Sequence, residues 1–293
     1  MSLDMPLVIA HLGPQGTYSE AAALAYANWL KQTQNLSASL RSYPSITQAI
    51  KATAMAETHL AVVPVENSIE GGVTATLDSL WQLDGLNIQK ALVLPILNAC
   101  LSKTSDFSLI QKVYSHPQAL GQCQGWLDQY LPQAQLIPTR STVDALQHIS
   151  SDLQAAAIAS RWAAQLYNLP VLACPINDHA DNCTKFWVVG LASSQQGTHT
   201  SIAFSLPVNA PGALLKALQI FASQNINLSR IESRPSKRSL GDYVFFADLE
   251  VDASPSKVQQ ALEDLKGCTE TLKIFGSYAT LQISESEITP KLE

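Results

Sequence analysis

The stretch Asp181-Asn182-Cys183-Thr184-Lys185-Phe186-Trp187-Val188-Val189 is the part of this chain from which the fold is best worked out. Its first residues are typical of a polar turn, and the β-branched and aromatic run from Thr184 predicts a strand that ends at Gly190. The hydroxyl of Thr184 therefore stands where a loop enters a strand. Ligands bind at strand ends in α/β sheets, so this position is a candidate for function.

Two earlier segments share this design, a strand that runs into a loop with hydroxyl or amide side chains. They are Val62-Val63-Pro64-Val65-Glu66-Asn67-Ser68 and Val113-Tyr114-Ser115-His116-Pro117-Gln118. From Leu7 onward, short apolar runs alternate with helical patterns, which favours βα units and a mostly parallel sheet. The apolar stretch 88–101, broken by Pro95, predicts a strand that crosses into a second lobe. We expect an α/β fold with two lobes, about residues 7–85 with 180–192 and about residues 86–179.

The last third of the chain has another pattern, after residues 191–200 of linker composition. Strands are predicted at residues 201–208, 227–232, 243–251 and 271–283, and helices at residues 212–223 and 255–266. This βαββαβ order is that of a ferredoxin-like domain. We expect it to span residues 200–284, after a first domain of residues 1–192, and we expect the tail 284–293 to be disordered.

The charge and hydropathy of the chain argue against two classes of partner. The formal net charge is −6 and the pI is near 5.5, whereas nucleic acids and anionic membranes favour a basic face. No apolar run approaches the ~20 residues needed to cross a bilayer. We therefore expect no nucleic-acid and no membrane partner.

The cysteines and the N-terminus indicate a compartment. Five scattered cysteines form no Cys-x-x-Cys pair that would suggest zinc or redox work, so reduced, intracellular thiols are expected. The apolar run at residues 7–12 is too short for a signal-peptide core and has no basic leader. The sequence predicts a cytoplasmic protein.

Six motifs, in chain order, resemble those of the prephenate dehydratases. Four lie in the two-lobed part: Gly13-Pro14-Gln15-Gly16-Thr17-Tyr18-Ser19, Pro64-Val65-Glu66-Asn67-Ser68, Ser115-His116-Pro117-Gln118 and Thr184-Lys185-Phe186. The other two, Gly212-Ala213-Leu214-Leu215 and Glu232-Ser233-Arg234-Pro235, resemble the phenylalanine-binding motifs of the regulatory ACT domain in this family. The resemblance covers nearly the whole chain. It implies a two-lobed, periplasmic-binding-protein-like catalytic domain followed by a ferredoxin-like ACT domain.

The reaction that the resemblance implies sets three tasks. Prephenate is a dianion that loses carbon dioxide and a hydroxyl, and the electrons released by decarboxylation expel the hydroxyl, so no cofactor or metal is expected. The site must donate to the departing hydroxyl, hold the side-chain carboxylate and partly desolvate the carboxylate that leaves. The resemblance implies Thr184 as the donor, acting by a hydrogen bond because its alcohol is a weak acid. Glu66 is the expected neighbouring acid, since an apolar cleft raises a carboxyl pKa.

Further residues are candidates for binding the substrate. They are Gly16, Thr17, Asn67, Ser68, Ser115, Gln122, Lys185 and Phe186. Free amides at a helix start favour an anion near Gly16 and Thr17, although Thr17 can also be an N-cap and Asn67 can also cap a turn. Thr184 itself also suits packing in a strand. The family usually has arginine at the position of Lys185, and lysine lacks the planar two-pronged donor.

The C-terminal domain has its own candidate site, for the pathway end product phenylalanine. Gly212, Ala213 and Leu214 stand at a predicted helix start, where backbone amides can approach a carboxylate closely. The resemblance assigns the other wall to Asn227, Leu228, Glu232, Ser233, Arg234 and Pro235. The alternative is that glycine and proline only shape the ends of elements and that the charged side chains are solvated.

The predicted function is therefore the conversion of prephenate to phenylpyruvate in phenylalanine biosynthesis, inhibited by phenylalanine. Family members are typically dimers or tetramers, so the resemblance implies a homodimer or homotetramer. Two alternatives stay open: an arogenate dehydratase, whose substrate has an amine in place of the side-chain keto group, and a non-catalytic metabolite sensor. The intact Thr184 argues against the sensor, because a pure binder does not need the catalytic motifs.

Overall fold

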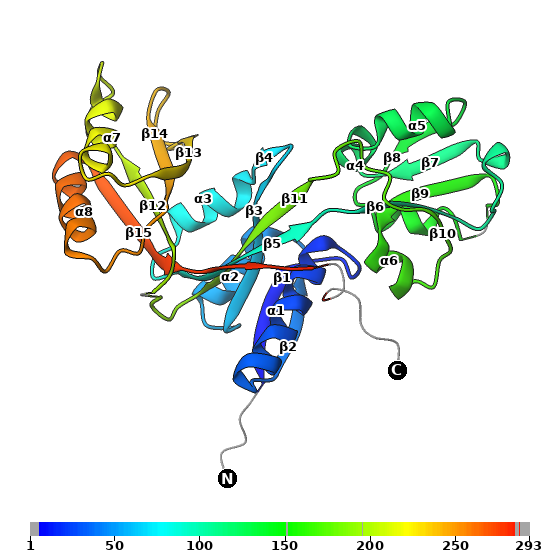
Figure 1. The fold of residues 1–293 in the computed structure, drawn as a ribbon, viewed down its shortest axis with the longest axis horizontal. Helices are drawn as coiled ribbons and strands as arrows, with labels where there is room; N and C mark the ends of the chain where they lie inside the picture. Colours follow the sequence, from blue (N-terminus) through cyan, green and yellow to red (C-terminus); the bar gives the residue numbers. More distant parts are fainter. Residues whose placement is uncertain (1–5, 151, 195, 285–286, 288–293) are drawn as a thin grey trace, which may run out of the picture.

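The molecule consists of three α/β units in a row, with the first lobe between the C-terminal domain and the second lobe (Figure 1). The computed structural model describes residues 6–150, 152–194, 196–284 and 287. Within these ranges no helix is both long and apolar enough to cross a membrane. Residues 285–286 and 288–293 of the tail, for which disorder is predicted, lie outside them.

The first lobe is built on a seven-stranded sheet. Its elements are β1 (Leu7–Leu12), α1 (Tyr18–Gln34), β2 (Ala38–Tyr43), α2 (Ile46–Ala54), β3 (Leu60–Asn67), β4 (Gly71–Gly72), α3 (Thr74–Gln82), β5 (Asn87–Pro95), β11 (Cys183–Gly190) and β16 (Thr280–Gln282). The strand order is β16-β5-β11-β3-β1-β2, and β4 pairs with β3. β1 is parallel to β2 and β3, but β11 is antiparallel to β3 and β5. The sheet is thus mixed rather than mostly parallel, because β11 returns from the second lobe against its neighbours.

The second lobe is built on a five-stranded sheet of order β10-β6-β9-β7-β8. Its elements are β6 (Asn98–Ser102), η1 (Phe107–Leu109), β7 (Lys112–Ser115), α4 (Pro117–Gly121), α5 (Gln124–Tyr130), β8 (Gln135–Pro138), η2 (Asp144–Gln147), β9 (Ala155–Ser160), α6 (Arg161–Leu166) and β10 (Val171–Ala173). The single strand predicted at residues 88–101 is two strands, of which β5 pairs with β11 in the first lobe. The chain therefore crosses after Pro95, later than the predicted boundary near residue 86.

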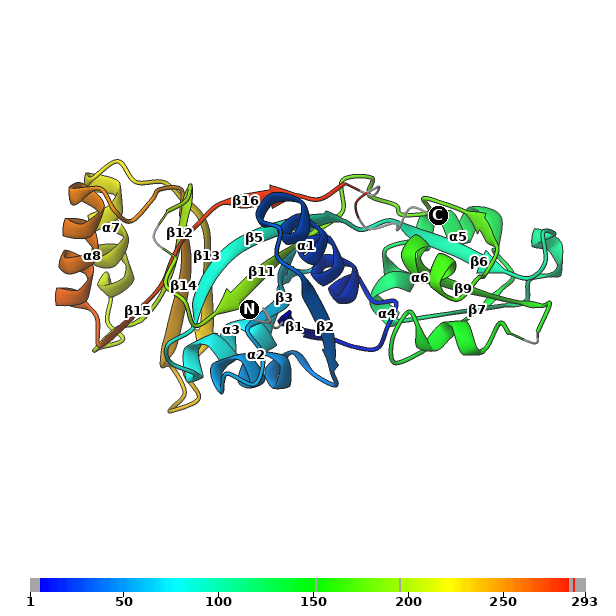
Figure 2. The same ribbon diagram turned by 90° about the horizontal axis from the view of Figure 1, so that it is seen from below.

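The C-terminal domain has the predicted βαββαβ order. Its elements are β12 (His199–Ser205), α7 (Ala213–Ser223), β13 (Leu228–Pro235), β14 (Tyr243–Leu249), α8 (Ser256–Cys268) and β15 (Thr271–Tyr278), with sheet order β13-β14-β12-β15. The single last strand predicted at residues 271–283 is wrong. The strand β15 ends before Ala279. After it, β16 leaves this sheet and pairs in parallel with β5 in the first lobe (Figure 2). The segment that follows the C-terminal domain is therefore an edge strand of the first lobe's sheet.

The C-terminal sheet is covered on both faces. Helices α7 and α8 pack on one face around Phe204. On the other face, Phe246, Phe275 and Tyr278 join the core of the first lobe, where Tyr278 meets Trp187 of β11 edge-on at 6.4 Å between ring centroids. β11 thus contacts the second lobe through its entry loop and the C-terminal domain through its body.

Candidate active site

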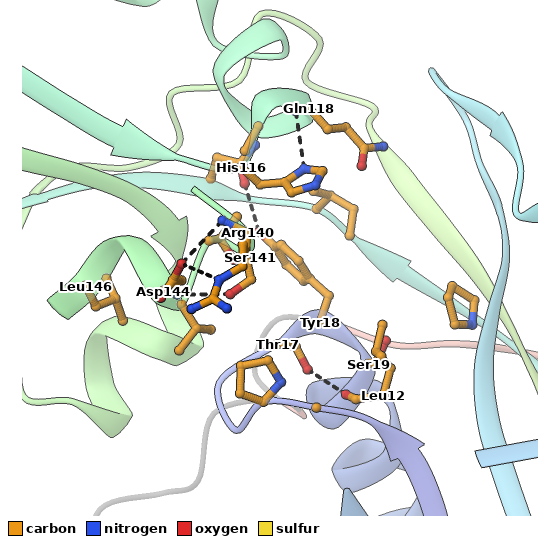
Figure 3. A pocket seen from close by; sticks show the side chains of 18 of the residues that line it. Leu12, Thr17, Tyr18, Ser19, His116, Gln118, Arg140, Ser141, Asp144 and Leu146 are labelled. Atoms are coloured by element: carbon orange, nitrogen blue, oxygen red, sulfur yellow. Dashed lines mark hydrogen bonds and ion pairs between the residues drawn. The ribbon is translucent and has the colours of Figure 1, made fainter. Parts of the chain in front are cut away.

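A cavity of about 1100 Å³ lies between the two lobes. Figure 3 shows Leu12, Thr17 and Tyr18 on the side of the first lobe, and His116 and Arg140 on the side of the second. These residues follow or end strands of the two sheets, as expected for a ligand site in an α/β fold. The cavity is slightly larger than the ~300–1,000 Å³ typical of small-molecule sites, so it can hold a small dianion together with water.

Thr184 and Asn67 stand opposite each other on β11 and β3, and both line the cavity. Asn67 Nδ2 donates to Thr184 Oγ1 at 3.0 Å. Each side chain is nearly buried, with 8% of its surface exposed. The structure thus brings together two of the predicted residues as a hydroxyl and amide pair at the cavity wall.

Gln122 reaches the same cavity from the second lobe. It caps the C-terminus of α4, which ends at Gly121 before α5 begins at Gln124. Its Oε1 accepts from Asn182 Nδ2 at 3.0 Å, and its Nε2 donates to Glu70 Oε1 at 3.2 Å. Gln118 also lines the cavity, and His116 caps α4 by accepting from the Gln118 amide at 3.3 Å. His116 therefore shapes the turn.

Glu66 and Lys185 lie on the opposite face of the same two strands. They are paired across β3 and β11 one position along from Asn67 and Thr184, and successive strand residues point to opposite faces. Lys185 Nζ lies 3.6 Å from Glu66 Oε2 and 3.6 Å from Asp248 Oδ2 of the C-terminal domain. Neither residue lines the cavity. The prediction that Glu66 neighbours Thr184 in the cleft is wrong in its geometry, and Lys185 makes an interdomain contact instead of a cleft contact.

The helix start at Gly16 and Thr17 is already occupied by an acidic side chain of the protein. The Gly16 amide donates to Glu20 Oε2 at 2.6 Å, and Thr17 is the N-cap of α1, accepting from the Glu20 amide at 3.3 Å. Glu20 also accepts from Trp162 Nε1 of the second lobe at 3.3 Å. Thr17 lines the cavity while Gly16 does not. The expected anion-binding amide of Gly16 is therefore bound to Glu20, whose carboxylate also accepts from the second lobe.

Ser115 and Ser68 make structural hydrogen bonds, whereas Phe186 lines the cavity. Ser115 is fully buried and donates to the Ile158 carbonyl at 2.6 Å, within the second sheet. Ser68 accepts from the Cys183 amide at 3.0 Å, which fixes the entry to β11. Neither serine lines the cavity, whereas Phe186 does.

Sequence reasoning missed Arg140. It lines the cavity, and among the described lining residues it and His116 are the two with basic side chains. Arg140 Nε lies 3.6 Å from Asp144 Oδ2, and the side chain is 94% exposed. A signal for it exists, because Thr139-Arg140-Ser141 follows the apolar run of β8 with the same design of strand and polar loop as the recognised motifs.

Burial fixes the protonation of two groups behind the cavity wall. Burial raises the pKa of the Cys123 thiol to about 12, and Asn98, which lines the cavity, donates to its sulfur at 3.7 Å. Burial also lowers the pKa of His11, against the opposing effects of its bond to the Leu12 carbonyl and of Glu20. The thiol and the imidazole are therefore both neutral near pH 7. Over the described part of the chain, no cluster of three or more His, Cys, Asp or Glu side chains is placed to hold a metal ion.

Comparison with known families decides how this cavity is interpreted. A family model described as prephenate dehydratase matches residues 9–194, and an ACT domain model matches residues 200–267. The first match alone covers more than half of the chain. The chain belongs to the prephenate dehydratase family.

Similar proteins span this chain almost from end to end. It is 39% identical to the bifunctional chorismate mutase/prephenate dehydratase of Aquifex aeolicus, over 97% of this chain and 77% of that protein. It is 37% identical to the prephenate dehydratase of Lactococcus lactis subsp. cremoris, over 94% and 99%. The structure of the Arthrobacter aurescens prephenate dehydratase in complex with L-Phe superposes with a TM-score of 0.83 at 34% identity, over 93% of this chain and 90% of that one.

The ACT residues predicted to bind the effector fall at two ends of one domain. Gly212 is the N-cap of α7 with a φ of 82°, a conformation that favours glycine, and Ala213 and Leu214 follow it. Asn227 and Leu228 come after the other end of α7, a helix about 16 Å long for its 11 residues. One protomer therefore does not bring all the predicted effector residues together.

The motif Glu232-Ser233-Arg234-Pro235 of the ACT domain alternates between two surfaces. Arg234 Nε lies 3.4 Å from Asp78 Oδ1 of the catalytic domain. Glu232 packs so close to Gly72 that a Cβ there would overlap its carboxylate. Ser233 and Pro235 are exposed. The charged pair therefore docks on the first lobe, which excludes the alternative that it is only solvated.

Proposed function

We propose that this chain converts prephenate to phenylpyruvate, with release of carbon dioxide and water, in the cavity between its lobes. The observation that carries the proposal is Thr184, a nearly buried hydroxyl at the cavity wall with Asn67 donating to it at 3.0 Å. This pair stands in a chain whose family is prephenate dehydratase. A hydroxyl that already accepts one hydrogen bond retains its own proton for a second partner.

The electron balance of the reaction assigns the task of Thr184. The bond from the ring to the carboxylate carbon breaks, its electron pair completes the aromatic ring, and the carbon–oxygen bond of the ring hydroxyl breaks in the opposite position. The departing hydroxide takes up one proton and leaves as water. A fixed donor aimed at that oxygen stabilises the charge as it develops, which is where enzymes gain most of their rate. Thr184 is the donor that stabilises the departing hydroxyl, and the proton comes from the solvent, so that the reaction consumes one proton overall.

Arg140 is the group that we assign to the substrate carboxylate. A dianion entering the cavity needs a cation, and the guanidinium of Arg140 has the planar donor geometry that matches a carboxylate. Its guanidinium lies 3.6 Å from Asp144 Oδ2, and both residues line the cavity. Exposed ion pairs of this kind are weak and exchange readily.

Phenylalanine regulation is proposed for the ACT domain. The Arthrobacter aurescens relative was solved with L-Phe, and the ACT model matches here. Because the predicted effector residues lie at both ends of α7, we propose that two copies of the chain complete each effector site, in a homodimer or homotetramer. Phenylalanine inhibits if it binds more tightly to a state in which the cleft is misaligned.

The experiment is phenylpyruvate formation from prephenate by the purified protein, with and without phenylalanine. The proposal predicts turnover that phenylalanine suppresses. Turnover without any response to phenylalanine, and no phenylalanine binding, contradicts the regulatory part. No turnover of prephenate with turnover of arogenate assigns the chain to the amine substrate. Silence on both substrates contradicts the catalytic proposal and favours a metabolite sensor.

A further inference from the structure

A continuous chain of side-chain amides runs from the surface to Thr184. Glu70 Oε1 accepts from Gln122 Nε2 at 3.2 Å, and Gln122 Oε1 accepts from Asn182 Nδ2 at 3.0 Å. Asn182 Oδ1 in turn accepts from Asn67 Nδ2 at 2.8 Å, and Asn67 Nδ2 also donates to Thr184 Oγ1 at 3.0 Å. Asn182 is almost fully buried, with 2% of its surface exposed.

The direction of donation along this chain is fixed at both ends. Asn67 Oδ1 accepts from the backbone amides of Ile69 and Glu70, at 3.0 and 3.1 Å, so its NH₂ group must face β11 and its entry loop. There Asn182 Oδ1 accepts at 2.8 Å, and Thr184 Oγ1 and the Cys183 carbonyl share the other N–H at 3.0 and 3.1 Å. At the other end Glu70 Oε1 is the acceptor, so the NH₂ group of Gln122 faces it. Asn182 between them therefore has a single allowed orientation.

We propose that Asn182, acting through Asn67, orients the Thr184 hydroxyl so that its proton points into the cavity. The hydroxyl has one hydrogen, and the N–H of Asn67 occupies one of its lone pairs from the wall side. The remaining direction for the proton is the cavity that Thr184 lines. The proposal rests on the proposed function, in which Thr184 donates to the departing hydroxyl.

Asn182 and Glu70 act by position, because neither lines the cavity. Gln122 belongs to the second lobe, whereas Asn67 and Glu70 belong to the first, so the chain of amides also spans the cleft. The arrangement of the two lobes is thereby linked to the orientation of Thr184. A small misplacement of a reacting group costs on the order of 100-fold in rate.

Reversing the direction of the chain tests the proposal. In Asn182→Asp the new carboxylate accepts from Asn67 and can no longer donate to Gln122, so Gln122 must turn and present its Oε1 to the Glu70 carboxylate. The repulsion between Gln122 Oε1 and the Glu70 carboxylate disturbs the contact between the lobes that holds Asn182 and Asn67, so we expect kcat to fall about 10- to 100-fold. Glu70→Gln alone still offers an acceptor and should stay within about threefold of wild type. The double variant Asn182→Asp/Glu70→Gln can donate from residue 70 to the turned Gln122, and it should regain about tenfold in kcat over Asn182→Asp.

Two controls separate orientation from charge and from folding. Asn182→Asp/Glu70→Ala removes the repulsion without supplying a donor, so it should recover less kcat than the double variant with glutamine. Should Asn182→Asp fail to fold in a thermal melt, Asn182→Ala is measured instead, with the same loss of kcat at unchanged KM expected. Wild-type kcat in the position-182 variants, with Thr184→Ala inactive, overturns this proposal alone. Wild-type kcat in Thr184→Ala overturns the proposed function of Thr184 itself.

Discussion

Thr184 and Lys185 are neighbours on β11, yet they serve different parts of the molecule. Thr184 faces the cavity between the lobes, where its partner Asn67 is a neutral amide. Lys185 faces the ACT domain, where its partners Glu66 and Asp248 are carboxylates. Successive strand residues point to opposite faces, so two neighbouring residues of β11 face the cavity and the ACT domain.

The same comparison explains the departure of this chain from the family pattern. Lysine at position 185 replaces the usual arginine, and its ammonium group lies in an interdomain ion cluster with Glu66 and Asp248. A point charge satisfies that contact, while the planar cation that a substrate carboxylate prefers is present as Arg140 in the cavity. With Arg140 proposed to bind the substrate carboxylate, lysine at position 185 is not required for that contact.

Breaking the ion cluster on the ACT face has the largest expected effect, and the effect is on stability. Asp248 is 1% exposed and pairs with Arg230 Nε at 3.1 Å as well as with Lys185. Asp248→Asn removes the buried carboxylate that the two cations share, while Arg230 keeps Glu232 at 3.2 Å and Lys185 keeps Glu66 at 3.6 Å. We therefore expect a loss at the lower end of the cost of breaking a buried pair, ~3 kcal/mol. Urea unfolding of Asp248→Asn should show this loss. The matched control is Asp84→Asn, whose exposed carboxylate pairs with Lys273, and it should leave the midpoint unchanged; an equally stable Asp248→Asn contradicts the prediction.

Removing the donor on the cleft face has the next largest effect, and the effect is on rate. Thr184→Ala should lower kcat on the order of 100-fold or more, the cost of losing one positioned donor. Thr184→Ser keeps the hydroxyl and should retain part of the rate. Urea unfolding of both variants, for which a stability loss of ~0.5–3 kcal/mol is typical, separates the loss of rate from loss of the folded state. Near-wild-type turnover by the alanine variant would remove Thr184 from the mechanism.

Removing the cation of the cavity should weaken substrate binding. Arg140→Ala is expected to raise KM about 10-fold or more with a smaller change in kcat, because a charge-assisted hydrogen bond to the substrate carboxylate is lost. The KM of Arg140→Lys should lie between those of wild type and Arg140→Ala. Arg41→Ala, on the edge strand β2 and away from the cavity, is the matched control. Equal KM values for the Arg140 and Arg41 variants would show that another group binds the carboxylate.

The smallest effect is expected for Glu66. Because its carboxylate faces Lys185 and the ACT domain, Glu66→Gln should leave the shape of the pH–rate profile unchanged. The profile of kcat/KM between about pH 5 and 9 is the measurement. Loss of one limb of the profile would return Glu66 to the role of an acid in the reaction.

The sequence predicted the parts of this protein that depend on local pattern. The βαββαβ order of the ACT domain follows from alternating strand and helix signals, and the loop–strand junction at Thr184 from a polar turn before a β-branched run. The strand period also separates Thr184 from Lys185, and Asn67 from Glu66, but it does not say which face meets the cavity. Placing all four residues in one site was therefore wrong for Lys185 on β11 and for Glu66 on β3.

Features that depend on distant partners could not be predicted in this way. The break at Ala279 sends β16 to pair with β5, almost 190 positions earlier in the chain, and the apolar pattern continues through the break. Asn182 lies in a turn that looks ordinary by composition, while its partners Asn67 and Gln122 are 115 and 60 positions away. Such contacts depend on how the parts of the molecule pack together. The residue pattern within a single strand carries no information about that packing.

The division of β11 between catalysis and regulation is tested most directly by titrating phenylalanine into the prephenate turnover of wild type and of Lys185→Met. The account predicts uninhibited rates that agree within about threefold, since a partly exposed ion pair is worth ~1 kcal/mol or less. It also predicts a shifted inhibition curve for Lys185→Met, because the contact to the ACT domain has changed. An uninhibited rate that collapses as in Thr184→Ala, with an inhibition curve like that of wild type, would contradict the account.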